Sequence, residues 1–328
     1  MGALIRHVFL VLLDVLTFGR VTSSPPPEPL DRTGTWGSDL PLPKEMAAAL
    51  TKGEVTCLTG PGDFAIPVRI FGEGGALLPV LMTHGLQSHS GWFAQSAALL
   101  AVRGHPVYAF DRGGSGLSRA PRGDCKDFMA WAREIEAVAE EAMRRHGARQ
   151  VYLLGHCFGA IPATVFASEH PDKIRALILT TPAIYTRTSL AWSQTLKILL
   201  WPAGRMDFVV PSPLETEWFS ELEEYKRFIA ADPLALRETT GDFCWQIYQA
   251  RRHLKANTER LTMPIFVALA GKDPISDVEK NSAWFQGLPS VRKLLVRYDD
   301  ARHVLEFSPE RDRFFSDLGR WLASLEEP

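Results

Sequence analysis

Hydrophobic and polar positions along the chain follow two patterns, one typical of buried strands and one typical of helices. Short apolar runs bounded by polar or turn residues predict strands, because a strand covered on both faces is apolar at nearly every position. Longer stretches with apolar residues at helical spacing predict helices, as between residues 126 and 146. Strands are predicted at residues 55–58, 66–71, 78–83, 106–110, 150–154, 176–180, 265–270 and 291–298, and further helices at 94–102, 160–169, 242–254 and 311–325.

Strands that alternate with helices predict a mostly parallel sheet with helices on both faces. The alternation stops between residues 182 and 261, which are rich in aromatic and aliphatic side chains but contain no convincing strand. We interpret residues 182–262 as a helical cap inserted into an α/β core, and assign the core to residues 45–181 and 263–328. Some apolar residues of the cap are expected to line an acyl pocket, and others to pack as ordinary core.

The N-terminal part, residues 1–44, consists of an apolar segment at residues 4–18 and a proline-rich linker. Asp14 interrupts the apolar segment, which is shorter than the roughly 20 residues that a membrane span needs. The same interruption, with a poor cleavage site at residues 21–24, makes a secretory signal the weaker explanation. Two interpretations stay open: an amphipathic helix that makes peripheral membrane contact, and a helix packed on the protein.

Composition narrows the class of protein. With 328 residues, of which 46% are hydrophobic and 23% charged, the chain is typical of a globular protein. A net charge of −2 and the lack of a basic tract argue against a nucleic-acid partner. Cys57, Cys125, Cys157 and Cys244 show no paired or CxxC spacing, which argues against a disulfide framework and a zinc site. We therefore expect a cytoplasmic location, with membrane association possible through residues 4–18, and no metal or diffusible cofactor.

The chemistry centres on Gly155-His156-Cys157-Phe158-Gly159, between a predicted strand and a predicted helix. A strand, a sharp turn with small flanking residues and a helix form the context of a nucleophile elbow, which exposes its central side chain above the sheet. Cys157 is that central residue. A helix N-terminus and a nearby histidine both favour the thiolate, which is the nucleophilic form of cysteine.

Nucleophilic acyl transfer also needs a base and a group that orients the base. Asp273 is the first carboxylate after the strand at residues 265–270, and His303 follows the last strand. Both are therefore expected beside Cys157, because an open α/β sheet places its site at the carboxyl ends of the strands. Asp277 is the alternative acid, although a helix N-cap explains it better.

The tetrahedral intermediate needs hydrogen-bond donors for its oxyanion. In an elbow of this kind one donor is the backbone N–H of the residue after the nucleophile, here Phe158. The other comes from the loop after the third strand, where His84-Gly85 is followed by Leu86. His84 and His156 are alternative bases, and each is better explained by a structural role.

These motifs together resemble the α/β-hydrolases of the monoacylglycerol lipase and lysophospholipase-like group, also called serine aminopeptidase S33-type hydrolases. The similarity rests on the His84 loop, the glycine-rich loop from Asp111, the elbow, Gly-Lys-Asp-Pro from Gly271 and Ala-Arg-His-Val-Leu from Ala301. It covers roughly residues 45–325, the size of one domain. The resemblance implies an α/β-hydrolase fold and a small-molecule or lipid-like acyl substrate, whose identity it does not specify.

Cys157 departs from the group, which has serine at the elbow. Three explanations are open: a natural cysteine nucleophile, as in dienelactone hydrolases and polyhydroxyalkanoate synthases, an inactivated descendant, or an engineered replacement of serine. Because the other catalytic candidates are present, we favour a working cysteine. We expect an acyl hydrolase that cleaves an ester or thioester of a hydrophobic acyl group through an acyl-cysteine intermediate. The alternatives are an acyltransferase to an amine, alcohol or thiol, and a non-catalytic binding protein.

Overall fold

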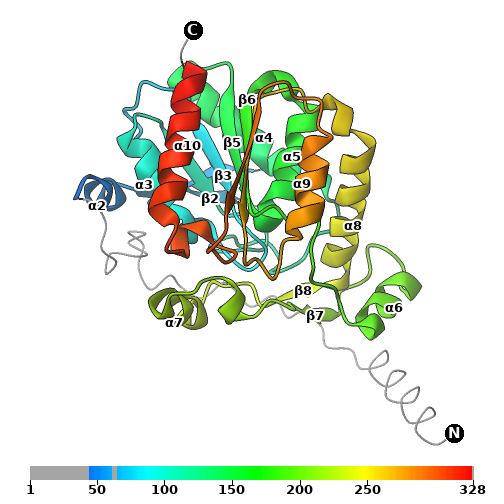
Figure 1. Cartoon of the computed structure of the whole chain (residues 1–328). Helices are drawn as coiled ribbons and strands as arrows, with labels where there is room; N and C mark the ends of the chain where they lie inside the picture. Colours follow the sequence, from blue (N-terminus) through cyan, green and yellow to red (C-terminus); the bar gives the residue numbers. More distant parts are fainter. Residues whose placement is uncertain (1–43, 61–64, 327–328) are drawn as a thin grey trace, which may run out of the picture.

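An eight-stranded sheet forms the centre of the computed structural model, which describes residues 44–60 and 65–326 (Figure 1). The strand order is β1-β2-β4-β3-β5-β6-β9-β10. The strands are β1 (Glu54–Thr59), β2 (Ala65–Phe71), β3 (Val80–Thr83), β4 (Val107–Phe110), β5 (Val151–His156), β6 (Ile174–Thr180), β9 (Ile265–Ala270) and β10 (Lys293–Tyr298). All of the strands predicted from apolar runs are therefore confirmed, with ends shifted by up to two residues.

The sheet is mostly parallel, as predicted. β1 pairs with β2 and β2 with β4 in antiparallel fashion, whereas every other neighbouring pair is parallel. β3, β4 and β5 are buried at every position, which explains why their sequences are continuous apolar runs. The parallel strands, β3, β5, β6, β9 and β10 among them, run in the same direction. The loops that follow them therefore lie together at the carboxyl ends of the strands.

Helices lie on both sides of the sheet in Figure 1. One group pairs α3 (Ala94–Val102) with α10 (Arg311–Glu326), and the other packs α5 (Ala160–Glu169) between α4 (Met129–His146) and α8 (Gly241–Ala256). Two other helices of the chain are α2 (Lys44–Thr51) and α9 (Val278–Gln286). α4 begins at Met129 rather than at residue 126, because Lys126 and Phe128 form backbone hydrogen bonds with the side chain of Gln246.

The segment between β6 and β9, which we call the insertion, contains two short strands and so corrects the prediction that it has none. β7 (Val209–Pro211) and β8 (Glu238–Thr240) pair antiparallel. Strands this short show no periodicity in the sequence, and each needs a distant partner. With α6 (Trp192–Leu200) and α7 (Glu223–Ala231) they lie beyond one end of the central sheet (Figure 1).

Some of the sequence-based predictions concern residues outside those that the structure describes. These are the apolar segment at residues 4–18 and the linker that follows it. Among the helices within residues 44–60 and 65–326, none has the length and apolar character to cross a membrane. The membrane-surface helix at residues 4–18 stays a prediction.

Candidate active site

β5 ends in a sharp turn at which Cys157 has a positive φ of 51°. This left-handed conformation is unfavourable for a residue with a side chain, so the surrounding structure must hold it. A Cβ atom at Gly155 would lie 2.8 Å from the backbone of Ala160, and one at Gly159 would lie 2.4 Å from the Thr83 carbonyl oxygen. Close approach of backbone therefore requires both glycines, as in a nucleophile elbow.

Cys157 lines a pocket of about 350 Å³ between the sheet edge and the insertion. The core contributes Leu86 and Phe158 to its walls, and the insertion contributes Val210 and Tyr248. The expectation that the elbow leaves its side chain exposed is wrong, because Cys157 is only 4% exposed. The insertion covers the turn, so that a reactant reaches the thiol through the pocket.

Asp273 and His303 meet in the interior of the protein. His303 Nδ1 lies 2.8 Å from Asp273 Oδ2 and 3.0 Å from Oδ1, and both side chains are fully buried. The loop that carries His303 is fastened to the insertion, since the backbone N–H groups of His303 and Val304 donate to the carbonyls of Trp218 and Phe219. The ring is thus oriented by a carboxylate on one side and by its backbone on the other.

The second ring nitrogen of His303 is available for chemistry. Nε2 is buried, and Cys157 acts on the ring both by its charge and by a side-chain hydrogen bond. Burial alone would lower the pKa of His303, but the charges of Asp273 and Cys157 outweigh burial and raise this pKa from 6.5 to about 10. The protonated form of the ring is therefore the favoured one, with Asp273 on one side and the sulfur of Cys157 on the other.

Asp273 and Asp277 have different surroundings. Asp273 Oδ1 also accepts backbone hydrogen bonds from Ile275 at 2.8 Å and Ser276 at 3.0 Å. Asp277 is the N-cap of α9, where it accepts from the Lys280 backbone N–H at 3.1 Å. The hydrogen bond from the Lys280 side chain holds the pKa of Asp277 below its usual value. The structure therefore brings Asp273, and not Asp277, to His303.

A buried arginine, Arg112, fixes the loop that carries Leu86. Its Nη1 donates to the Gly85 carbonyl and its Nη2 to the Leu86 carbonyl, each at 2.7 Å. Because C=O and N–H of one peptide point in opposite directions, the bond to Gly85 O sets the direction of the Leu86 N–H. The guanidinium also lies 4.7 Å from the centre of the Phe158 ring. Sequence analysis did not identify this role, although Arg112 lies only two residues after Phe110, where β4 ends.

Comparison with known proteins identifies the family. The family model described as serine aminopeptidase, S33 matches residues 78–310, which is more than half of the chain. The chain belongs to this S33 family. Monoglyceride lipase from Rattus norvegicus is 25% identical over 251 residues, covering 74% of this S33 chain and 82% of the rat protein.

Solved structures show the same fold for the S33 chain. The monoacylglycerol lipase of Paleococcus ferrophilus superposes with a TM-score of 0.70 at 22% identity, covering 81% of this chain and 100% of that one. A soluble variant of Saccharomyces cerevisiae monoglyceride lipase, in complex with a substrate analog, gives 0.72 at 18% identity, covering 83% and 96%. The α/β-hydrolase fold predicted for the S33 chain is thereby confirmed.

Two other histidines of the S33 chain lie beside the site. Burial, followed by the positive charge of Arg112, lowers the pKa of His84 to about 3. Burial and the charge of His303 place the pKa of His156 well below its ordinary value. His156 Nδ1 is also engaged by the Thr180 hydroxyl at 2.9 Å. Both rings are therefore neutral and weakly basic, which fits a structural role better than that of the base.

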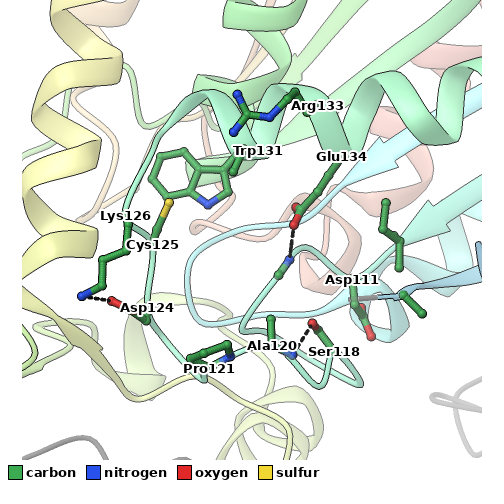
Figure 2. A pocket seen from close by; sticks show the side chains of 14 residues that line it. Asp111, Ser118, Ala120, Pro121, Asp124, Cys125, Lys126, Trp131, Arg133 and Glu134 are labelled. Atoms are coloured by element: carbon green, nitrogen blue, oxygen red, sulfur yellow. Dashed lines mark hydrogen bonds and ion pairs between the residues drawn. The ribbon is translucent and has the colours of Figure 1, made fainter. Parts of the chain in front are cut away.

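A second pocket of the S33 chain, about 420 Å³ in volume, lies between the loop after β4 and α4 (Figure 2). Its cysteine, Cys125, donates to the Asp127 carbonyl at 3.2 Å, and burial raises the pKa of its thiol to about 12. Glu134 accepts from the Gly113 backbone N–H, and burial raises its pKa to about 7. No histidine is among the described residues that line this pocket.

Metal ligands are the remaining possibility for a cofactor site. The part of the chain that the structure describes contains no group of three or more His, Cys, Asp or Glu side chains that could hold a metal ion.

Proposed function

We propose that this S33 protein is an acyl hydrolase, which cleaves an ester or thioester of a hydrophobic acyl group with Cys157 as nucleophile. One observation carries the proposal: His303 is hydrogen-bonded through Nδ1 to buried Asp273, and Asp273 and Cys157 together raise the pKa of the ring. Most residues that line the pocket are apolar, for example Leu86, Ile161 and Ile275, which suits a hydrophobic acyl chain. The name of the rat relative, monoglyceride lipase, supports an ester of this kind.

In the first half of the proposed reaction, the Cys157 thiolate attacks the acyl carbonyl carbon. The carbonyl π electrons move to oxygen, and the backbone N–H groups of Leu86 and Phe158 stabilise the resulting oxyanion. As the tetrahedral intermediate collapses, His303 donates its Nε2 proton to the departing alcohol or thiol. The products of this half are an acyl-cysteine thioester and a neutral histidine, which Asp273 keeps oriented.

In the second half, water takes the place of the leaving group. Neutral His303 removes a proton from the water, whose oxygen attacks the thioester carbonyl. Collapse expels the Cys157 thiolate, releases the carboxylic acid and restores the imidazolium. The two halves together consume one water and regenerate the starting ion pair.

The insertion fits the role of a cap over this site. We propose that residues 182–262 form the cap, and that residues 45–181 and 263–328 form the core. Support comes from β6, which ends at Thr180, from β9, which begins at Ile265, and from the pocket, whose walls come from both parts.

Acyl transfer to an amine, alcohol or thiol is the second candidate activity, and Cys157 is the observation that favours it. A thioester is more prone than an ester to attack by these nucleophiles, so an acyl-cysteine can pass its acyl group to an acceptor other than water.

Mass spectrometry after incubation with a panel of acyl esters and thioesters tests the proposal. We expect the Cys157 peptide to gain the mass of the acyl group, and Cys157→Ala to show neither the adduct nor turnover. Repeating the reaction with amine and alcohol acceptors separates hydrolysis from transfer by the product formed. Acylation at another residue, or full turnover by Cys157→Ala, would reject the mechanism and leave a binding protein as the explanation.

A further inference from the structure

One charged side chain, Arg251 of α8, lines the pocket that contains Cys157. Among the described residues that line this pocket, it is the single Lys, Arg, Asp or Glu, and the others are apolar or carry hydroxyl or thiol groups. Sequence analysis did not identify Arg251, since nothing in the pattern of α8 distinguishes it from the adjacent Arg252. Only the packing of α8 against α5 brings it to the pocket.

Among the described residues, no carboxylate is paired with this guanidinium. Nη2 donates to the Ala183 carbonyl at 2.8 Å and to the Thr186 hydroxyl at 3.5 Å, and both acceptors are neutral. Nε is buried without a hydrogen-bond partner among the described residues. Nη1 is neither bonded nor buried within the same residues. Glu169, at the end of α5, does bind α8, but through His253: its Oε1 lies 2.8 Å from His253 Nε2.

A charge in such surroundings is costly. A partly buried cation loses hydration, and without an ionic partner this loss is not recovered. Burial accordingly lowers the pKa of Arg251, and the charge of Cys157 opposes the shift, so the two groups interact electrostatically. A bound anion in the pocket would compensate the Arg251 guanidinium for the hydration that it loses on burial.

Arg112, the other arginine that interacts with Cys157, is different. It is fully buried behind the loop of Gly85 and Leu86, and its Nη1 and Nη2 donate to their carbonyls. It does not line the pocket. Arg112 therefore serves the loop, whereas Arg251 is available to a bound molecule.

We propose that Arg251 binds an anionic oxygen group, a carboxylate or a phosphate, of the acyl substrate. The inference rests on the proposed function and specifies its substrate class: an ester or thioester with a negative charge on either the acyl or the leaving-group side. Arginine suits both anions because its planar donors match their oxygens. Tyr248, three residues earlier on the same helix face, also lines the pocket and is 51% exposed.

Two matched substrate pairs test the proposal and locate the charge. The first pair, 4-nitrophenyl pentanoate and mono-4-nitrophenyl glutarate, differs by a carboxylate on a five-carbon acyl group. The second pair, a 1-acylglycerol and the 1-acylglycerol 3-phosphate of the same chain, differs by a phosphate on the leaving group. We expect Arg251→Gln to lower the anionic-to-neutral ratio of kcat/KM by about 10- to 100-fold in one pair, mainly through KM, since a hydrogen bond to a charged group is lost.

Two further variants separate charge from structure. Arg252→Gln removes the same charge from an exposed position on the same helix, and we expect it to leave the ratio within about twofold. Arg251→Lys keeps the charge and should recover much of the ratio. An equal loss on both members of each pair in Arg251→Gln would mean that Arg251 acts only by holding Ala183, and would overturn the proposal.

Alkylation of Cys157 gives a readout that does not depend on turnover. Iodoacetate carries a carboxylate and iodoacetamide does not, so we expect Arg251→Gln to reduce the ratio of their rates at Cys157. If this ratio falls but no ester or thioester acylates Cys157, the anion site stands and the proposed hydrolase fails. If esters acylate Cys157 but neither the rate ratio nor the kcat/KM ratios change in Arg251→Gln, the hydrolase stands and the anion site is rejected.

Discussion

Replacing Asp273 with asparagine tests the proposed triad with almost no change in shape. In the structure Asp273 Oδ1 accepts from the backbone of Ile275 and Ser276, while Oδ2 lies 2.8 Å from His303 Nδ1. An asparagine that keeps its oxygen on the two backbone donors must place its NH₂ group against Nδ1. The ring then presents the Nδ1 lone pair to the amide and carries its proton on Nε2, facing Cys157. In that tautomer His303 cannot take the thiol proton.

The size of the effect follows from this tautomer. Loss of the correctly oriented, charge-stabilised histidine costs roughly 10⁴-fold in kcat in a serine enzyme with such a triad. This corresponds to about 5.5 kcal/mol of transition-state stabilisation. The fold should survive, because the two backbone donors keep an acceptor and the number of heavy atoms in the buried site does not change.

Asp277→Asn is the matched control. Asparagine caps helices about as well as aspartate, so this variant should stay within about twofold of the parent in kcat. Initial rates on the best ester, measured with thermal unfolding midpoints for each variant, compare the two. Equal losses at the two positions, or a larger loss at Asp277, would refute the assignment of the acid and the tautomer argument with it.

Three further predictions concern the nucleophile, the base and the N-terminus. Iodoacetamide at near-neutral pH should modify Cys157 before the exposed Cys57, and activity should fall in step with that modification. Faster labelling of Cys57 would contradict the assignment of the nucleophile. Cys157→Ser should keep ester hydrolysis but lose chemistry that needs a thioester. Because the pKa of His303 is raised to about 10, the imidazolium persists to alkaline pH, so kcat/KM should fall as the pH rises through about 10; a limb near 6.5 would disprove the ion pair. Deleting residues 1–25 should abolish liposome binding without lowering the thermal midpoint if residues 4–18 lie on membranes, whereas a lower midpoint would mean that they pack on the domain.

Most strands and helices of the fold could be predicted from local sequence. Strands such as β5 and β9 are buried along their whole length, so their apolar runs are visible without any knowledge of their neighbours. The elbow was equally visible, since Gly155 and Gly159 are demanded by contacts at atomic distance that no other residue permits. β7 and β8 were missed because each is three residues long and exists only through its pairing with the other.

Chain order and strand ends by themselves determined which residues to consider: Cys157, Asp273 and His303 each follow a strand of one parallel sheet, and parallel strands end at the same edge. Only the tertiary structure decided how these groups are surrounded. The insertion covers Cys157, and its carbonyls at Trp218 and Phe219 hold the loop of His303. Contacts between segments far apart in the chain also raise the pKa of His303 and bring Arg251 to the pocket with no paired carboxylate among the described residues. Burial and the distances between charged groups depend on the packed chain, and no local pattern of residues encodes them.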